Sequence, residues 1–528
     1  MKPRNGYVRA LLTDLYEITM AYAYYKSGKH EDRAVFDLFF RKNPFGGEFT
    51  LFAGLSDVVA FVRDFGFTDE DVNYICTVMP HCSADFKGWL KSLNCAKVRV
   101  FAVEEGSVVF PRVPMIRVEG PLGVCQLLES ALLNLVSYPS LVATNAARMK
   151  IAAGDRASVV EFGLRRAQGP DGAISGSRYT YLGGADGTSN MMAGRMFGIP
   201  VSGTQAHAFV SSFGGFDDLK TRQLADPKGK EHDLVELALK YRDGLGYGGT
   251  NDGELAAFVA YAQAFPEGFL ALVDTYDTLK SGVPNFLCVA LALHEIGYKP
   301  IGIRLDSGDL SHLSKASRLM LKDIAEKFDV PFGQLTIVAS NEINEATLRS
   351  LDQQGHEIDI FGIGTHLVTC QSQPSLGCVY KLVEVNDQPR IKLSQDTAKL
   401  TIPGRKEAYR LIGREGYPVL DLMIQIGEEP PSPGRKILCC HPIEQTKRTY
   451  VTPSSVIPLH TCVWDGGIVE ELPSLEETRR RAGEQIKSLR VDHVRMLNPT
   501  PYKVSVSEGL YDFMHKLWLR EAPVGEIY

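Results

Sequence analysis

The chain has no run of apolar residues long enough to cross a membrane. Its longest uninterrupted apolar run is Phe286–Leu293, whereas a membrane-spanning helix needs about 20 such residues. Near the N-terminus, Asp14 and Glu17 interrupt what would have to be the apolar core of a signal peptide. We therefore expect no membrane partner.

The chain also has no Cys-x-x-Cys pair. Its ten cysteines are scattered, and only Cys439 and Cys440 are adjacent. This distribution favours reduced thiols over a disulfide framework or a zinc site. We therefore expect an intracellular protein of the cytosol.

A surplus of basic residues is likewise missing. The 57 Lys and Arg residues face 63 Asp and Glu residues, which gives a formal net charge of −6. A general nucleic-acid-binding protein carries a basic surplus, so we expect no nucleic-acid partner. The 528 residues, 44% of them hydrophobic, exclude a mainly disordered chain and predict two or three folded domains.

The first and last parts of the chain have mixed patterns. Residues 1–121 are predicted to form an α+β N-terminal domain, with a helix over 11–25 and strands over 35–40, 98–103 and 114–118. The helix would place Leu12, Leu15, Tyr16, Thr19 and Ala23 on one apolar face. Residues 383–528 are predicted to form an accessory region that packs partly on the N-terminal domain. Its charged helix, 475–489, starts with a capping box of Ser474 and Glu477.

Residues 122–382 have the pattern of an α/β barrel. We expect strands at 158–162, 200–203, 269–273, 300–305, 335–339 and 358–362, and helices at 285–296, 310–328 and 345–353. Strands that alternate with helices in this way predict a parallel sheet with right-handed crossovers, whose closed form is a βα barrel.

Polar residues follow every one of these strands. They are Gly163 with Arg165 and Arg166, then 204–207, 274–277, 306–309, Ser340 with Asn341, and 362–365. In a βα barrel these strand ends meet at one rim, where catalytic loops gather. The sequence therefore predicts an active site at this rim.

Several of these groups suit a phosphorylated substrate. Gly364 and Thr365 offer backbone and hydroxyl donors to a phosphate, although such turns often serve packing alone. Asp306 and Asp309 flank a tight turn that suits a sugar diol or Mg²⁺, or an N-cap for the next helix. Arg148, Arg156, Arg165 and Arg166 form a basic cluster suited to phosphate or carboxylate, or simply a solvated face.

Two further residues stand out. Arg304 lies inside an apolar strand, where its charge needs a partner or a ligand. His207 follows a barrel strand in a glycine-flanked polar segment and suits either a general base or a nucleophile. The residues alone thus indicate a phosphate-binding barrel enzyme with Arg, Asp and one His, and leave the reaction open.

At these residues the chain resembles the nicotinate phosphoribosyltransferase family. The matching segments are LTDLY at 12–16, NPFGG at 43–47, LVATNAAR at 141–148, GLRRAQGPDG at 163–172, GTQAH at 203–207, RLDSGD at 304–309, GIGT at 362–365 and PSLGCVYKL at 374–382. Their order agrees as far as about residue 382, and the region beyond about 400 is less diagnostic.

The resemblance implies an irregular βα barrel of the type II phosphoribosyltransferases and an ATP-coupled reaction. Phosphoribose would pass from 5-phosphoribosyl 1-diphosphate to nicotinate, with nicotinate mononucleotide and diphosphate as products, which is the first step of NAD synthesis from nicotinate. It further implies a phosphorylated His207, Mg²⁺ or Mn²⁺, and a homodimer.

The resemblance also implies roles for individual residues. The catalytic residues would be His207, Asp306 and Arg304. Nicotinate would be bound by Tyr16 (offered by the partner subunit), Thr204 and Arg304. Phosphoribosyl diphosphate would be bound by Thr365, Gly364, Arg148, Arg166, Asp274 and Asp306. The metal ligands stay open, with Asp274 and Asp306 as candidates.

Three alternatives remain. Nicotinamide phosphoribosyltransferase shares the fold and the histidine, but the segment 164–170 fits the nicotinate enzyme better. An unrelated barrel lyase or isomerase would turn over a sugar phosphate instead. A non-catalytic ligand-binding protein would bind nicotinate without turnover.

Overall fold

The computed structural model describes residues 5–393 and 399–523. Two compact units form the chain. The first unit combines Met1–Asn145 with Cys370–Tyr528, and the second is Ala146–Thr369. These boundaries differ from the predicted ones at 121/122 and 382/383. The helix α6 (Glu129–Ala153) runs continuously across the observed boundary between Asn145 and Ala146, so that no linker marks the change of unit in the sequence.

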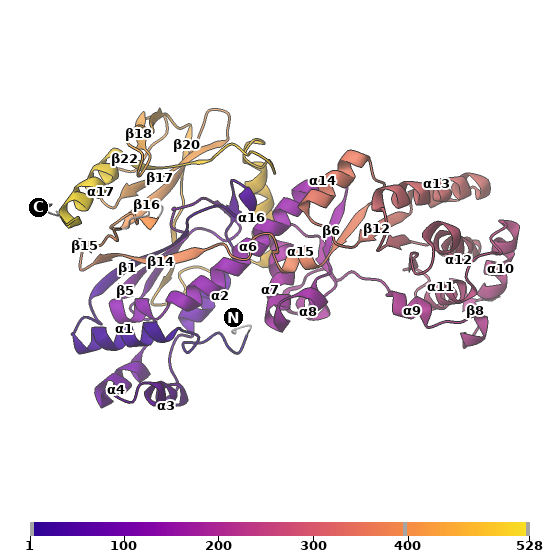
Figure 1. The fold of residues 1–528 in the computed structure, drawn as a ribbon, viewed down its shortest axis with the longest axis horizontal. Coiled ribbons are helices and arrows are strands. Elements are labelled where there is room, and N and C mark those ends of the chain that lie inside the picture. Colours follow the sequence, from indigo (N-terminus) through magenta and orange to yellow (C-terminus); the bar gives the residue numbers. More distant parts are fainter. Residues whose placement is uncertain (1–4, 394–398, 524–528) are drawn as a thin grey trace, which may run out of the picture. The chain divides into compact units, whose positions relative to one another are not determined.

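The first unit is built around two six-stranded sheets (Figure 1). One has the order β15 (Gln388–Pro389), β14 (Cys378–Val385), β1 (Arg33–Phe40), β5 (Ile116–Pro121), β3 (Arg99–Ala102) and β21 (Thr461–Asp465). The other has the order β19 (Arg448–Val451), β18 (Ile437–Cys440), β22 (Lys503–Ser507), β17 (Pro418–Gln425), β16 (Lys406–Ile412) and β20 (Ser455–Pro458). The first sheet thus joins strands from the N-terminal and C-terminal parts of the sequence.

Helices and one small ladder complete this unit. They are α1 (Leu15–Lys26), α2 (Leu55–Arg63), α3 (Asp69–Val78), α4 (Ala84–Ser92), α5 (Leu122–Gln126), α6, α16 (Leu475–Lys487) and α17 (Glu508–Glu521), with β2 (Thr50–Leu51) paired to β4 (Val108–Val109). The predicted capping box of Ser474 and Glu477 is confirmed at the start of α16.

The predicted apolar face of α1 is wrong. Its buried residues are Glu17, Ile18 and Ala21, whereas the side of Leu15 and Tyr16 is turned outward, with Tyr16 44% exposed. The carboxylate of Glu17 is tolerated inside because it accepts a hydrogen bond of 3.1 Å from the backbone N–H of Ser130. A hydrophobicity pattern does not register such a bond, and it therefore selected the wrong side.

The second unit is organised on a six-stranded parallel sheet. Its order is β10 (Leu270–Leu272), β11 (Gly302–Leu305), β12 (Thr336–Ser340), β13 (Ile360–Ile363), β6 (Ser158–Glu161) and β7 (Gly187–Thr188). All five pairings are parallel, and a bridge from Thr188 adds Val201 at the β7 edge. The strand predicted at 200–203 is therefore reduced to this bridge, and the barrel is irregular.

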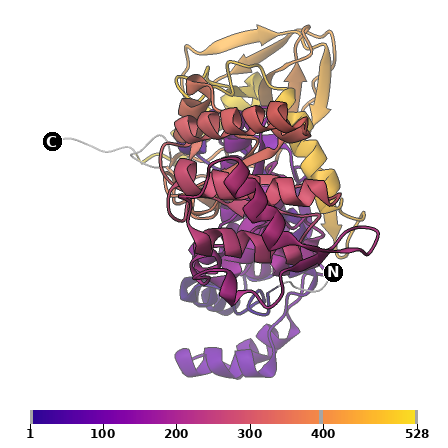
Figure 2. The ribbon, with the colours of Figure 1, turned by 90° about the vertical axis from the view of Figure 1, so that its right-hand side faces the viewer.

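Helices pack on this sheet and bury its apolar residues in one core (Figure 2). They are α7 (Gly169–Leu182), α8 (Met191–Phe197), α9 (His207–Ser211), α10 (Leu234–Gly244), α11 (Asp252–Ala264), α12 (Val283–Glu295), α13 (Leu310–Phe328), α14 (Glu345–Gln354) and α15 (Thr365–Val368), beside a hairpin of β8 (Gln223–Ala225) and β9 (Glu231–Asp233). The prediction for α13 is confirmed at both ends. No helix in the described parts of the chain is long and apolar enough to span a membrane.

Candidate active site

The carboxyl ends of adjacent parallel strands bring the predicted polar residues together. Asp274 follows β10, Arg304 and Asp306 lie at the end of β11, and Ser340 ends β12. Since these three strands are neighbours in the sheet, their side chains share one rim. Asp309, by contrast, caps α13 through the backbone N–H of His312, so only Asp306 of the two predicted carboxylates joins this cluster.

Arg304 is the centre of the contact network. Its Nη2 donates to Asp306 Oδ1 at 3.1 Å, and its Nε donates to Ser340 Oγ at 2.9 Å. Its Nη1 has longer contacts, 3.3 Å to Thr204 Oγ1 and 3.5 Å to the Gln205 carbonyl oxygen. The buried charge thus has the partner that its place in an apolar strand demanded. Nη1 is the nitrogen held least tightly.

The carboxyl of Asp306 is kept ionised by these neighbours. Burial favours its protonated form, but the hydroxyl of Ser340 and the charge of Arg304 hold the pKa of Asp306 below its ordinary value of 3.8. Oδ1 accepts from both Ser340 and Arg304. The side chain keeps 26% of its surface exposed, so a charged oxygen remains available at the rim.

His207 lies beside two carboxylates at the start of α9. Its Nε2 is 3.6 Å from Asp306 Oδ2 and 3.9 Å from Asp274 Oδ1, and its Nδ1 is 3.1 Å from Thr275 Oγ1. The side chain is 43% exposed. A ring with acidic neighbours on one nitrogen, a hydroxyl on the other and access to solvent can serve as a nucleophile or a proton carrier.

Asp274 is almost completely buried, with 2% of its side chain exposed. Its Oδ2 accepts from the backbone N–H of Asp306 at 3.0 Å and from the hydroxyl of Ser307. Its Oδ1 has no hydrogen-bond partner within the described part of the chain. A buried carboxylate oxygen without a donor is costly unless a cation or a donor from outside the protein satisfies it.

A cavity of about 100 Å³ opens beside this network. Its lining includes Arg165, Arg166, Arg304, Asp306, Ser340, Gly364 and Thr365. Arg166 is exposed and has no ion pair among the described residues. Gly362 also borders the cavity. This residue must be glycine because a Cβ there would lie 2.4 Å from the Phe162 ring. The predicted glycine turn thus serves close packing at a cation-lined cavity, and its binding of a phosphate stays a prediction.

Two of the predicted residues are not among those that line this cavity. Arg148 is 4% exposed and is held by Glu345, with Nε 2.8 Å from Oε2, so its guanidinium is engaged away from this cavity. Tyr16 belongs to the first unit. Partial burial and the nearby Glu129 raise the pKa of Tyr16 to about 12, which keeps its phenol neutral.

Sequence reasoning missed the roles of two residues. Ser340 was noted only as a polar strand end, but it touches both Arg304 and Asp306. Glu161 is fully buried at the end of β6 and accepts hydrogen bonds from Ser177 at 2.7 Å and Thr188 at 2.6 Å. It also accepts from the backbone N–H of Gly163, which fixes the turn that leads to Arg166. The signal was available, since Glu161, like Arg304, is a charge in an apolar strand.

The carboxylates suit a divalent cation that is shared with a substrate. No group of three or more His, Cys, Asp or Glu residues in the described ranges is arranged to hold a metal by itself. Mg²⁺, however, is commonly held by one or two carboxylates together with substrate phosphates. The unsatisfied Oδ1 of Asp274 and the exposed carboxylate of Asp306 fit this mode of binding.

Comparisons with known proteins identify the family of the chain. Family models described as nicotinate phosphoribosyltransferase N-terminal domain and C-terminal domain match residues 11–137 and 405–514. The chain is 56% identical to "Nicotinate phosphoribosyltransferase" of Dictyostelium discoideum, covering 100% of this chain and 91% of that protein. It is 47% identical to the Homo sapiens protein of the same name, covering 98% of each.

Solved structures are similar as well. The crystal structure of human nicotinic acid phosphoribosyltransferase superposes with a TM-score of 0.87 at 44% identity, over 96% of this chain and 99% of that one. A nicotinate-nucleotide pyrophosphorylase from Pyrococcus furiosus, 22% identical with a TM-score of 0.60 over 91% of this chain and 95% of that one, shares the fold. By its sequence and its fold, the chain belongs to the nicotinate phosphoribosyltransferase family.

Proposed function

We propose that the protein transfers phosphoribose from 5-phosphoribosyl 1-diphosphate to nicotinate and releases nicotinate mononucleotide and diphosphate, as the first step of NAD synthesis from nicotinate. The observation that carries this proposal is the network of Arg304, Asp306 and His207 at the barrel rim. It occurs in a chain that is 56% identical to a protein named nicotinate phosphoribosyltransferase.

The rim supplies what this reaction needs. The ribose carbon becomes cationic as the bond to diphosphate breaks, so an enzyme gains most by aligning the two reactants and stabilising both developing charges. The cavity with Thr365, Gly364 and Arg166 offers donors and a positive charge to the 5′-phosphate. Asp306, kept ionised, faces the ribose. A role of Arg148 in binding the diphosphate rests on the resemblance alone, because its guanidinium is paired with Glu345 in this structure.

Mg²⁺ or Mn²⁺ would be held by Asp306 and Asp274 together with the diphosphate. The ion, when bound, would neutralise charge on the leaving diphosphate. The protein's own part is to present two carboxylates at a fixed spacing, which the backbone N–H of Asp306 maintains through its hydrogen bond to Asp274.

ATP would enter the cycle through His207. We propose that a ring nitrogen of His207 attacks the γ-phosphorus while the bond to the ADP oxygen breaks, which leaves phosphohistidine and ADP. The carboxylates near Nε2 favour a proton there, so the lone pair of Nδ1, next to Thr275, is the nucleophile. A phosphoryl group at this position changes the charge at the rim and thereby the affinity for the substrates.

Nicotinate would be recognised by its carboxylate. The Nη1 of Arg304 and the hydroxyl of Thr204 are joined by a contact of 3.3 Å that a carboxylate can replace with shorter ones. Tyr16 would stack on the pyridine ring from the partner subunit of a homodimer, and its 44% exposure on α1 supports such a use. A cytosolic location completes the proposal, supported by ten free cysteines.

The proposal is tested by one assay of the purified protein with phosphoribosyl diphosphate and Mg²⁺, with and without ATP. We expect nicotinate mononucleotide from nicotinate, stimulated by ATP, and little product from nicotinamide. Product from nicotinamide alone would assign the sister activity, and no product from either substrate would refute the proposal.

Replacing His207 tests the covalent step. Wild-type protein incubated with ATP labelled in the γ-phosphate should acquire an acid-labile, base-stable label, as phosphohistidine does. His207→Ala should carry no label and should lose the stimulation by ATP. His312→Ala, at an exposed position on α13, is the matched control and should be labelled like the wild type. Label that persists in His207→Ala would exclude this residue.

Replacing Arg304 tests substrate selection. Hydrogen bonds to charged groups contribute about 1.5–3 kcal/mol, so Arg304→Ala should raise the KM for nicotinate about 10- to 100-fold. Arg318→Ala removes another buried arginine of the same unit, one bound to Asp359, and controls for lost stability. An equal change in KM in both variants would mean that Arg304 is structural.

The Ser340 hydroxyl should govern the ionisation of Asp306. The lowered pKa of Asp306 stabilises the folded protein. This stabilisation is present at pH values above the pKa of the unfolded state, and it is lost as the pH falls through the pKa of the folded state. Ser340→Ala should therefore lower the free energy of unfolding by about 1–3 kcal/mol at neutral pH and by less in acid. Urea unfolding from neutral pH to the lowest pH at which both proteins fold, with exposed Ser350→Ala as control, measures this. A cost that does not vary with pH would contradict the assignment.

A further inference from the structure

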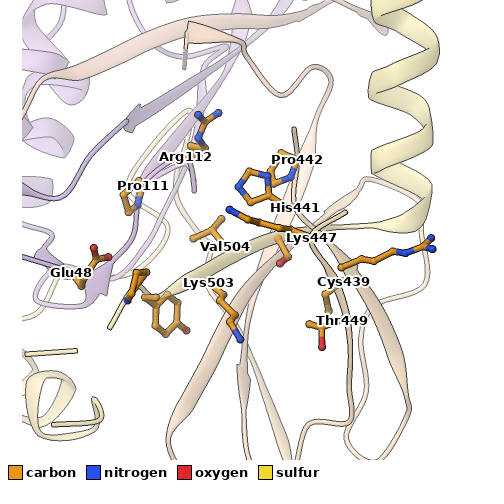
Figure 3. A pocket seen from close by; sticks show the side chains of 14 residues that line it. Glu48, Pro111, Arg112, Cys439, His441, Pro442, Lys447, Thr449, Lys503 and Val504 are labelled. Atoms are coloured by element: carbon orange, nitrogen blue, oxygen red, sulfur yellow. The ribbon is translucent and has the colours of Figure 1, made fainter. Parts of the chain in front are cut away.

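The first unit contains a second cavity that the proposed reaction does not use. It has a volume of about 450 Å³ and lies where β18, β19 and β22 meet the loop of Pro111 and Arg112 (Figure 3). All of its lining residues belong to the first unit, and none is among the barrel-rim residues described above. A volume of this size is typical of small-molecule sites.

The lining is strongly basic. Arg112, Lys447, Arg448 and Lys503 contribute four positive charges, and Glu48 is the one acid in the lining. Only Lys447 of the four has an ion pair within the described residues, 2.8 Å from Glu444. The whole chain, by contrast, has a net charge of −6. Positive charge that is concentrated in a cavity without matching acids indicates an anionic ligand.

Arg112 is held in place at the edge of this cavity. It is half-buried, and its φ of 73° lies in the left-handed region that few non-glycine residues adopt. Its backbone N–H donates to the Phe40 carbonyl at 2.8 Å. Burial lowers the pKa of Arg112, and the nearby Arg41 lowers it further. An anion bound beside Arg112 would offset this repulsion. Residues in such sparsely populated backbone conformations often occur at functional sites.

His441 belongs to the same positive region. Its Nδ1 accepts from the backbone N–H groups of Ile443 at 3.2 Å and Glu444 at 2.9 Å, so in the neutral ring Nε2 carries the proton and is a donor. Burial lowers the pKa of His441; Glu444 opposes this, while Lys447 and Arg112 add to it. Arg112, His441 and Lys447 all line the same cavity. Figure 3 shows them on the same side of the pocket.

Part of the remaining lining is apolar. Pro111, Pro442 and Val504 supply apolar surface beside the cations. Tyr502, also in the lining, is buried, stacks on Phe110 with ring centroids 3.5 Å apart, and donates to Asp421 at 3.0 Å. A preformed pocket loses little entropy when a ligand binds.

We propose that this cavity binds an organic phosphate of mononucleotide size. Its phosphate lies among Arg112, His441 and Lys447, which offer guanidinium, imidazole and ammonium donors. Its uncharged body lies against Pro111, Pro442 and Val504. The site is separate from the proposed reaction and does not depend on it.

AMP is a suitable probe, with adenosine as the control that lacks the phosphate. Because AMP is also expected to bind at the barrel rim, hydrogen–deuterium exchange is used to separate the two sites. AMP should protect the backbone amides of 437–451 and 501–507, and adenosine should not. Lys447→Glu should raise the AMP concentration that gives half-maximal protection of these segments at least tenfold. Lys436→Glu, the same charge change in an exposed residue just before β18 and outside the lining, should leave it unchanged.

Three results would overturn the proposal. They are protection by AMP of barrel segments alone, equal protection by AMP and adenosine, or equal binding by Lys447→Glu and Lys436→Glu. If thermal melting shows that Lys447→Glu is unfolded, His441→Gln provides the second variant, with the same expected loss of affinity and the same contrary result.

Discussion

The site depends on the ion pair of Arg304 and Asp306 at the end of β11. The two residues are neighbours at the same strand end, so their ion pair does not require distant parts of the chain to come together. The neighbouring strands then define its surroundings, since β12 supplies Ser340 and β10 leads to Asp274. Removal of either charge would leave the other partly buried without a partner, which usually destabilises a protein strongly. The stability of the strand end and the arrangement of the site therefore both depend on this ion pair.

Hydrogen-bonding partners at this rim are shared rather than duplicated. Ser340 touches both members of the ion pair, and Asp274 holds the backbone of Asp306 and the hydroxyl of Ser307. Sharing of this kind fixes positions to a fraction of an ångström, which is the precision that catalysis needs. It leaves Oδ1 of Asp274 without a hydrogen-bond donor among the described residues and Nη1 of Arg304 with only long contacts, and these are the atoms that we propose to face a ligand.

Much of this arrangement was predictable because it follows from local patterns. The spacing of apolar residues and the N-cap predicted the helix α13. The apolar strands with polar ends predicted the rim and placed Arg304, Asp306 and His207 on it. The face of α1 was not predictable, because the bond from Ser130 that allows Glu17 to be buried comes from a distant helix. The role of Ser340 was equally hidden, since it depends on a strand neighbour. Resemblance supplied the reaction itself, which no spacing implied.

The position of β22 in its sheet has a consequence for synthesis of the protein. This strand, at 503–507, lies between β18 and β17 and is parallel to β17. The sheet is therefore incomplete at its centre until residues 503–507 have left the ribosome, whereas the second unit has all its strands by residue 363. The barrel can thus begin to fold first. A nonsense mutation at residue 499 would leave the barrel sequence whole and open the other unit along two unpaired strand edges.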